Sequence, residues 1–213
     1  MTTLLLVRHG ESEANRRKFF AGQKDVPLLS RGEEQAALTA KYISETYNVS
    51  AVYASDLCRA YKTGEIISEA LKVPLKAHAG LREVYAGEWQ GKTFDLLNRD
   101  YAQSYSVWCK DIGNCRCTGG ESIRELARRV LAACTEIALA HEGETVVIAT
   151  HATPIRALRC ICSGRDMDEM KYVPWVSNAS VTEITYDNGK WSVLRESIDA
   201  HLSGLKSVLP PNV

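Results

Sequence analysis

The chain has 213 residues, and its 26 lysines and arginines balance its 26 aspartates and glutamates, so the formal net charge is zero. A balanced charge gives no overall field that would attract nucleic acid or a membrane surface. No apolar segment approaches the length of a membrane span, and the first residues lack the pattern of a secretory signal, so we expect a cytoplasmic protein. This length is typical of one domain with a substantial core, and residues 1–213 are predicted to form a single domain.

The seven cysteines are an odd number in a chain without a secretory signal, which indicates free thiols rather than a disulfide framework. Two close pairs, Cys115 with Cys117 and Cys160 with Cys162, lack the spacing of a zinc or redox motif. We therefore expect no metal site at either pair.

The first eighty residues alternate strand-length apolar runs with amphipathic helical stretches. Ser30 and Glu33 form a capping-box pattern ahead of the first helix, and Ser55 with Asp56 offers capping chemistry for the second. The predicted elements are a strand at 3–8, a helix at 30–47, a strand at 51–54, a helix ending near 71 and a strand at 74–78.

Residues 81–120 break this alternation, because they carry two tryptophans, several tyrosines and scattered glycines without an evident strand. A helical stretch is predicted around residues 94–110. We interpret the segment as an excursion over the edge of the sheet that builds a lid or a pocket wall. Its aromatic residues form either a wall for an apolar leaving group or the lid's own core, and general burial preferences favour the core.

After the excursion, Ser122 and Glu125 form a second capping box ahead of a helix, and residues 144–150 are the clearest strand. Pro154 then sits where a further helix can start. Residues 181–194 predict a hairpin with its turn at 187–190, and the tail at 203–213 is expected to be peripheral. Together the elements predict an α/β fold: a three-layer α/β/α sandwich with a mainly parallel central sheet and an antiparallel edge hairpin.

Two of the predicted strands end in a histidine, at His9 and His151, and Arg8 directly precedes the first. Arg59 follows a third strand within the first turn of its helix. Because the carboxyl ends of parallel strands share one edge of the sheet, these side chains are expected to meet there and to form an anion site. Taken singly, each has an ordinary alternative, such as a surface arginine or a satisfied core histidine. A metal site at the two histidines is disfavoured by the adjacent arginines, which repel cations.

The stretch Val7-Arg8-His9-Gly10-Glu11-Ser12-x-x-Asn15 resembles the signature of the histidine phosphatase superfamily, in its phosphoglycerate-mutase-like branch. The resemblance extends from residue 4 to about residue 159 in the family's order. Its further matches are Asp25-Val26-Pro27-Leu28-x-Ser30-x-Gly32, Ser55-Asp56-Leu57-x-Arg59-Ala60, Leu81-Arg82-Glu83, Gly87-Glu88-Trp89-Gln90-Gly91, Gly119-Gly120-Glu121-Ser122 and Thr150-His151.

The resemblance implies that His9 is the nucleophile and accepts the phosphoryl group as a phosphohistidine. It implies that Arg8, Arg59 and His151 hold the phosphoryl oxygens and offset charge in the transition state. On this basis no metal and no cofactor is required.

The resemblance also implies that Glu83 is the general acid for the leaving oxygen and later the base that activates water, which requires a raised pKa. The ordinary alternative for Glu83 is a salt bridge with Arg82. Asn15 and Gly22 match positions that line the phosphate or substrate, and Ala152 offers a backbone N–H towards the phosphate where many members have glycine.

The run from Arg82 to Gly91 is similar to the phosphatase members, including alpha-ribazole phosphatases and broad-specificity phosphatases, whereas mutases carry a longer insertion. The expected function is therefore metal-independent hydrolysis of a small phosphomonoester, with alpha-ribazole phosphate as a candidate substrate. The alternatives are a cofactor-dependent phosphoglycerate mutase and a non-catalytic phosphate-binding regulatory domain. No nucleic-acid or membrane partner is expected, and family habit suggests a homodimer.

Overall fold

The computed structural model describes residues 1–207 and has a six-stranded sheet with the strand order β3-β2-β4-β1-β5-β6. The strands are β1 (Thr2–Arg8), β2 (Ala51–Ala54), β3 (Leu75–Ala77), β4 (Thr145–Thr150), β5 (Val181–Asp187) and β6 (Lys190–Ile198). The α-helices are α1 (Glu13–Arg17), α2 (Ser30–Thr46), α3 (Cys58–Leu71), α4 (Phe94–Asp100), α5 (Ala102–Lys110), α6 (Ile123–Ala140) and α7 (Ala152–Cys162).

The first four strands of the chain are parallel to one another, while β5 runs antiparallel to β1 and β6 antiparallel to β5. The hairpin of β5 and β6 therefore lies at one edge of the sheet, as predicted. In the register of the central pair, Arg8 lies beside Thr150, so β1 and β4 end at the same level. The predicted α/β sandwich with a mainly parallel sheet is confirmed.

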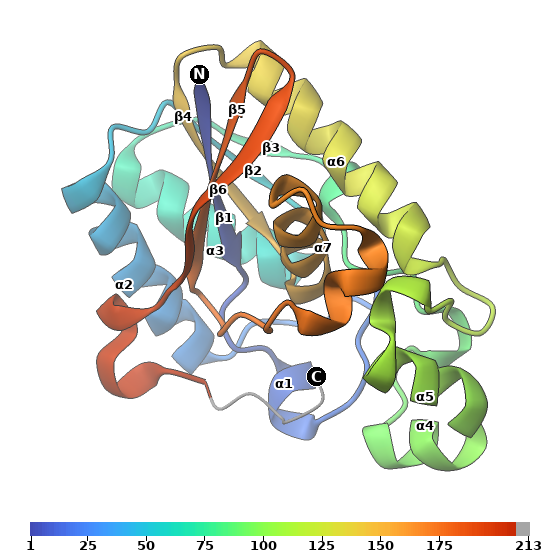
Figure 1. Cartoon of the computed structure of the whole chain (residues 1–213). Helices are drawn as coiled ribbons and strands as arrows, with labels where there is room; N and C mark the ends of the chain where they lie inside the picture. The colour runs from blue at the N-terminus through green and yellow to red at the C-terminus, as the bar shows by residue number, and fades with distance from the viewer. Residues whose placement is uncertain (208–213) are drawn as a thin grey trace.

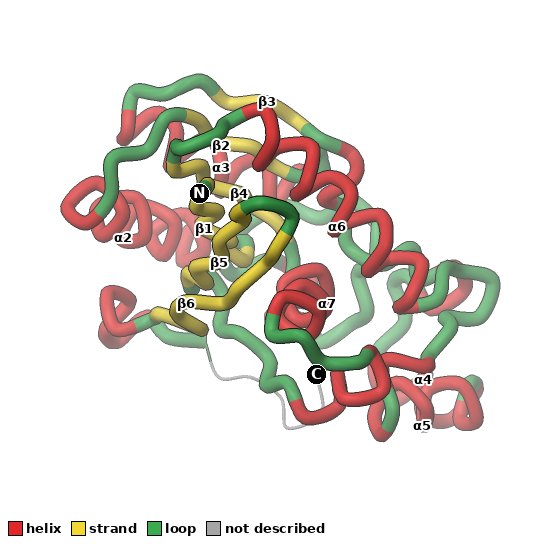
Figure 2. The backbone as a smooth tube through the Cα atoms, turned by 45° about the horizontal axis from the view of Figure 1, so that its top comes forward, coloured by secondary structure: helices red, strands yellow, loops and turns green. Residues whose placement is uncertain are grey.

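Helices cover both faces of the sheet, with α2 and α3 on one side and α6 and α7 on the other (Figures 1 and 2). Successive residues of β1 point to opposite faces. Leu4 and Leu6 are fully buried in the cluster that includes residues of α6 and α7. Leu5 and Val7 are fully buried against residues of α2 and α3. This burial on both faces explains why the strand is an uninterrupted apolar run rather than an alternating one.

The excursion contains two short helices where the sequence predicted one. The peptide chain bends at Tyr101, which has φ −127° and ψ 28° and separates α4 from α5. The N–H of Tyr101 closes the last turn of α4 on Leu97, and its carbonyl accepts from Tyr105 to start α5. Trp89, Tyr105 and Trp108 are at least nine-tenths buried, and Trp89 contacts both of the others edge to face. These three aromatic residues therefore form the core of the excursion.

Two of the predicted helix starts need correction, although the capping box at Ser122 and Glu125 is confirmed. Ser30 does not cap α2, because it is already the first helical residue and Leu29 occupies the cap position. For α3 the capping acceptor comes from elsewhere in the chain.

The cap of α3 is the carboxylate of Asp25, whose Oδ1 accepts from the N–H of Cys58 at 2.8 Å. Ser55 instead accepts a hydrogen bond from Leu57, the residue at the cap position, in a local turn. The helix start thus depends on a contact between segments 33 residues apart, which local sequence does not reveal.

The last described residues pack against α2 rather than lying apart from the domain. Gln35 donates to the carbonyl of Leu205 at 2.7 Å, and Lys206 and Ser207 line the cavity described below. This differs from the predicted peripheral tail at 203–213, of which residues 208–213 lie outside the described part. All seven cysteines are free thiols. Within residues 1–207, the helices are too short or too polar to cross a membrane.

Candidate active site

The carboxyl ends of β1, β4 and β2 lie side by side and bring the predicted residues together. The N–H of His9 bonds to the carbonyl of Thr150 at 2.9 Å, and the N–H of Ser55 bonds to that of Ala149 at 2.9 Å. The rings of His9 and His151 meet edge to face with centroids 5.3 Å apart. The structure thus brings the two strand-end histidines together at one edge of the sheet.

The imidazole of His9 is held with one nitrogen bonded and the other free. Its Nδ1 lies 2.7 Å from the carbonyl oxygen of Gly10, an acceptor only, so Nδ1 carries the proton. Burial, together with the charges of Arg59 and Arg8, holds the pKa of His9 well below its usual value. The ring is therefore neutral, and Nε2 presents a lone pair. Gly10 is fixed in turn, because its N–H donates to the hydroxyl of Thr63 at 3.2 Å.

Two buried guanidinium groups flank His9, and backbone carbonyls orient both. Arg8 donates to the carbonyl of Val176 at 2.6 Å, and burial lowers its pKa to about 10, so it stays cationic at neutral pH. Arg59 donates to the carbonyls of Lys24 and Gly22 at 3.0 and 2.7 Å. Burial also lowers the pKa of Arg59. Neither guanidinium forms an ion pair within 4 Å among the described residues, so their charge is available to an anion.

His151 is completely buried behind His9. Its Nε2 lies 2.9 Å from the hydroxyl of Ser55, while its Nδ1 finds no hydrogen-bond partner within residues 1–207. Burial and the charge of Arg59 lower the pKa of His151 well below its usual value, so the ring is neutral. The predicted contact of this histidine with phosphoryl oxygens stays a prediction, because His151 is not among the residues that line the cavity.

Glu83 is partly buried, and burial raises the pKa of its carboxyl group above the usual value. Its two oxygens accept from the N–H groups of Val84 at 2.8 Å and Thr153 at 3.4 Å. The alternative salt bridge with Arg82 does not form, because Arg82 makes a bidentate pair with Asp56 instead. A carboxyl group that stays protonated closer to neutral pH is suited to donating a proton.

The three remaining predicted residues, Asn15, Gly22 and Ala152, all line the same cavity. Asn15 is held by Ser12, whose N–H and hydroxyl both donate to its Oδ1. Gly22 also accepts a hydrogen bond from Arg59 and has a positive φ of 53°, a conformation that favours glycine. All of the predicted site residues except His151 thus share one cavity.

Asn178 is a site residue that sequence reasoning missed. Its amide nitrogen donates to the carbonyl of His9 at 3.0 Å and lies 3.3 Å from both the carbonyl of Gly10 and the Oδ1 of Asn15. It lies in the loop before β5 and lines the cavity. It lies in the run Ser177-Asn178-Ala179-Ser180, whose other residues are small, so only the tertiary contact distinguishes it from an ordinary loop asparagine.

The cavity has a volume of about 480 Å³. We call its charged part, around Arg8, His9 and Arg59, the floor, and its aromatic part the wall. Its aromatic lining residues are Phe19, Phe20, Phe94, Trp108 and Trp175. Trp175, which sequence reasoning also missed, is held by Arg156, whose guanidinium lies 4.3 Å from the ring centroid. Within residues 1–207, no group of three or more histidine, cysteine or acidic side chains is arranged to hold a metal ion.

Comparisons with known proteins agree with this geometry. The family model of the histidine phosphatase superfamily (branch 1) matches residues 4–199. Phosphoserine phosphatase 1 of Hydrogenobacter thermophilus is 30% identical over 205 residues, which are 95% of each chain. Phosphoglycerate mutase-like protein 4 of Arabidopsis thaliana is 31% identical over 89% of this chain and 82% of its own.

A solved structure, that of YhfR from Bacillus stearothermophilus, superimposes with a TM-score of 0.90 at 31% identity. The alignment covers 95% of this chain and all of that one. The family match, the shared fold and the paired histidines at the strand ends lead to one conclusion: the chain belongs to the histidine phosphatase superfamily, branch 1.

Proposed function

We propose that this protein hydrolyses small phosphomonoesters through a phosphohistidine intermediate. The observation that carries the proposal is the state of His9, whose Nδ1 is bonded to Gly10 while Nε2 stays free beside two buried guanidinium groups. A neutral imidazole with a free Nε2 can attack phosphorus, and guanidinium groups can offset the negative charge of the transferring group.

In the first step, Nε2 of His9 forms a bond to phosphorus as the bond to the leaving oxygen breaks. Glu83 gives its proton to that oxygen, so the alcohol leaves neutral. In the second step, Glu83 takes a proton from water, and the resulting hydroxide displaces His9 from phosphorus. Inorganic phosphate is released, and both His9 and Glu83 return to their starting states.

A buried donor without a partner supports an anion as the ligand. The Nε–H of Arg8, which lines the cavity, is buried without a hydrogen-bond partner in the described chain. Buried donors are normally paired, because an unpaired one costs about 1–3 kcal/mol. A bound phosphoryl group would supply acceptors at this floor.

The aromatic wall favours a phosphate ester whose alcohol is partly apolar. Phe94 and Trp108 from the excursion line the same cavity as Arg8, His9 and Arg59. An apolar or ring-containing leaving group would bury surface there. Alpha-ribazole phosphate belongs in the substrate panel on this ground, with phosphoserine as a small polar comparison.

We also propose that the protein forms a homodimer. Light scattering in solution measures the molar mass and so tests this proposal.

The test compares the native protein with His9→Ala on 4-nitrophenyl phosphate in the presence of a metal chelator, beside an assay for phosphoglycerate mutase. We expect phosphate release that is unaffected by chelator and falls by at least about 10⁴-fold in the variant, as loss of a nucleophile does elsewhere. Strong mutase activity with slow hydrolysis would favour the mutase alternative. Activity that survives in His9→Ala would refute the phosphohistidine.

A further inference from the structure

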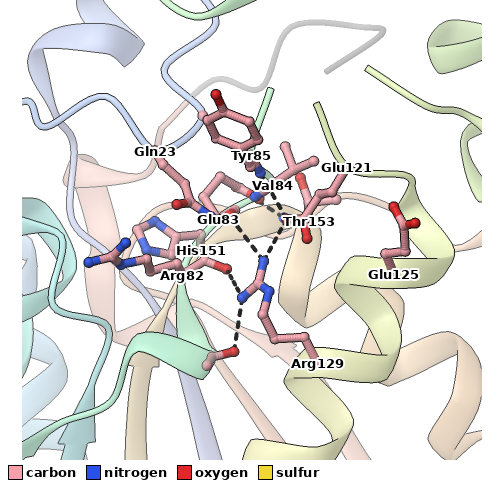
Figure 3. Close-up of polar contacts among 12 residues, drawn as sticks. Gln23, Arg82, Glu83, Val84, Tyr85, Glu121, Glu125, Arg129, His151 and Thr153 are labelled. Carbon is pink, nitrogen blue, oxygen red and sulfur yellow. Dashed lines mark hydrogen bonds and ion pairs between the residues drawn. The ribbon is translucent and has the colours of Figure 1, made fainter. Parts of the chain in front are cut away.

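The backbone around Glu83 is held by an arginine from the helix that follows the excursion in the chain. Arg129, on α6, donates from Nη1 to the carbonyls of Gly80 and Arg82, both at 3.0 Å. Its Nη2 donates to the carbonyl of Glu83 at 3.3 Å and to the carboxylate of Glu121 at 2.6 Å. Figure 3 shows the guanidinium reaching from α6 to the backbone beneath the Glu83 side chain.

Glu121 holds the same segment from its other end. Its carboxylate accepts from the N–H of Tyr85 at 2.8 Å, and its own N–H donates to the carbonyl of Tyr85 at 2.9 Å. Residues 82–86 belong to neither a helix nor a strand, so no ladder of backbone bonds supports them. Arg129 and Glu121 supply the partners that regular structure would otherwise provide.

We propose that Arg129 and Glu121 form a clamp that positions Glu83 for proton transfer to the leaving oxygen. Both are positioning residues, because they contact the backbone of the Glu83 segment and do not line the cavity. The inference rests on the proposed acid role of Glu83. A guanidinium is suited to this work, since its planar fork can serve several acceptors at fixed angles. A misplacement of about 1 Å is enough to cost about 10²-fold in rate.

The alternative is that the pair only stabilises the fold. The two roles separate through the leaving group. An acid matters most when the leaving alcohol is a weak acid and least when the leaving group departs unaided. Lower stability or less folded protein would reduce the hydrolysis of every ester by the same factor.

The experiment measures kcat/KM for two esters of similar size, 4-nitrophenyl phosphate and 4-nitrobenzyl phosphate, whose leaving alcohol is a far weaker acid. The variants are Arg129→Met, Glu121→Gln and Glu83→Gln. The matched control is Arg124→Met on the same helix, because Arg124 pairs with Asp168 and makes no contact with the Glu83 segment. Circular dichroism checks that each variant is folded.

We expect Arg129→Met to lose about 10²-fold more kcat/KM on the benzyl ester than on the phenyl ester, in the same direction as Glu83→Gln. Glu121→Gln should show the same bias to a smaller extent, and it carries the test if Arg129→Met does not fold. Arg124→Met should show no bias between the two esters.

Two results would overturn the inference in distinguishable ways. If Glu83→Gln discriminates between the esters while the folded clamp variants lower both equally, the clamp is wrong and the acid role stands. If Glu83→Gln itself does not discriminate between the esters, Glu83 is not the general acid. The positioning role of Arg129 and Glu121 is then refuted with it.

Discussion

The floor of the cavity is made of strand ends, one of which packs its backbone against the first turn of α2, whereas its wall is made of aromatic side chains from the excursion and neighbouring loops. At the floor, a side chain on Gly10 would overlap the carbonyl of Gly32 in α2, so the two backbones leave no room for a Cβ. At the wall, Phe94 is only partly buried and packs at the edge of the main core. On the proposed function, the chemistry would depend on a tightly packed backbone, and the choice of substrate on side chains that can be exchanged.

After the loss of His9 itself, the largest effect is expected at Glu83, which lies where the floor meets the excursion. Glu83→Gln should lower kcat/KM for 4-nitrobenzyl phosphate by about 10²–10⁴-fold, the usual contribution of a general acid. Since burial raises the pKa of Glu83 and the protonated form is active in the first step, native kcat/KM should fall as pH rises through that pKa. Glutamine does not titrate, so this alkaline limb should be absent from the pH–rate profile of the variant. An unchanged alkaline limb would assign it to another group.

A methyl group at the floor should disturb the nucleophile directly. Gly10→Ala forces its loop away from Gly32 and displaces the carbonyl that fixes Nδ1 of His9. We expect kcat/KM for 4-nitrophenyl phosphate to fall by about 10²-fold through misplacement of the nucleophile. Overpacking should also lower the free energy of unfolding by about 1–3 kcal/mol in a denaturant titration. Gly204→Ala is the control, because a Cβ there meets no atom within 4 Å. Equal losses in both variants would contradict this account of the floor.

The smallest effect is expected at the wall. Phe94→Ala should reduce kcat/KM for 4-nitrophenyl phosphate by about tenfold, the scale of a lost apolar contact, and leave that for methyl phosphate nearly unchanged. Tyr172→Ala is the control, because this tyrosine is 70% exposed and does not line the cavity. A loss of the same size for both esters would mean that Phe94 supports the floor rather than the leaving group.

Much of the floor could be predicted because its residues occupy ends of strongly patterned strands. Runs such as residues 3–8 and 144–150 are apolar enough to identify as buried strands, so His9 and His151 were expected at the same edge. Glu83 was different: no periodic pattern surrounds it, and only the family resemblance singled it out. The contacts that hold these residues, from Asn178 and Arg129, were not predicted.

By itself the sequence determined the layered fold, the edge hairpin and the meeting of two histidines and two arginines, because hydrophobic periodicity and chain order act along the chain. Only the tertiary structure decided that Asp25 caps α3, that Tyr101 ends α4, and that Trp175 joins the wall. The cap and the wall depend on which distant segments pack together. Backbone polar groups outside helices and strands form hydrogen bonds with the groups that tertiary packing places next to them.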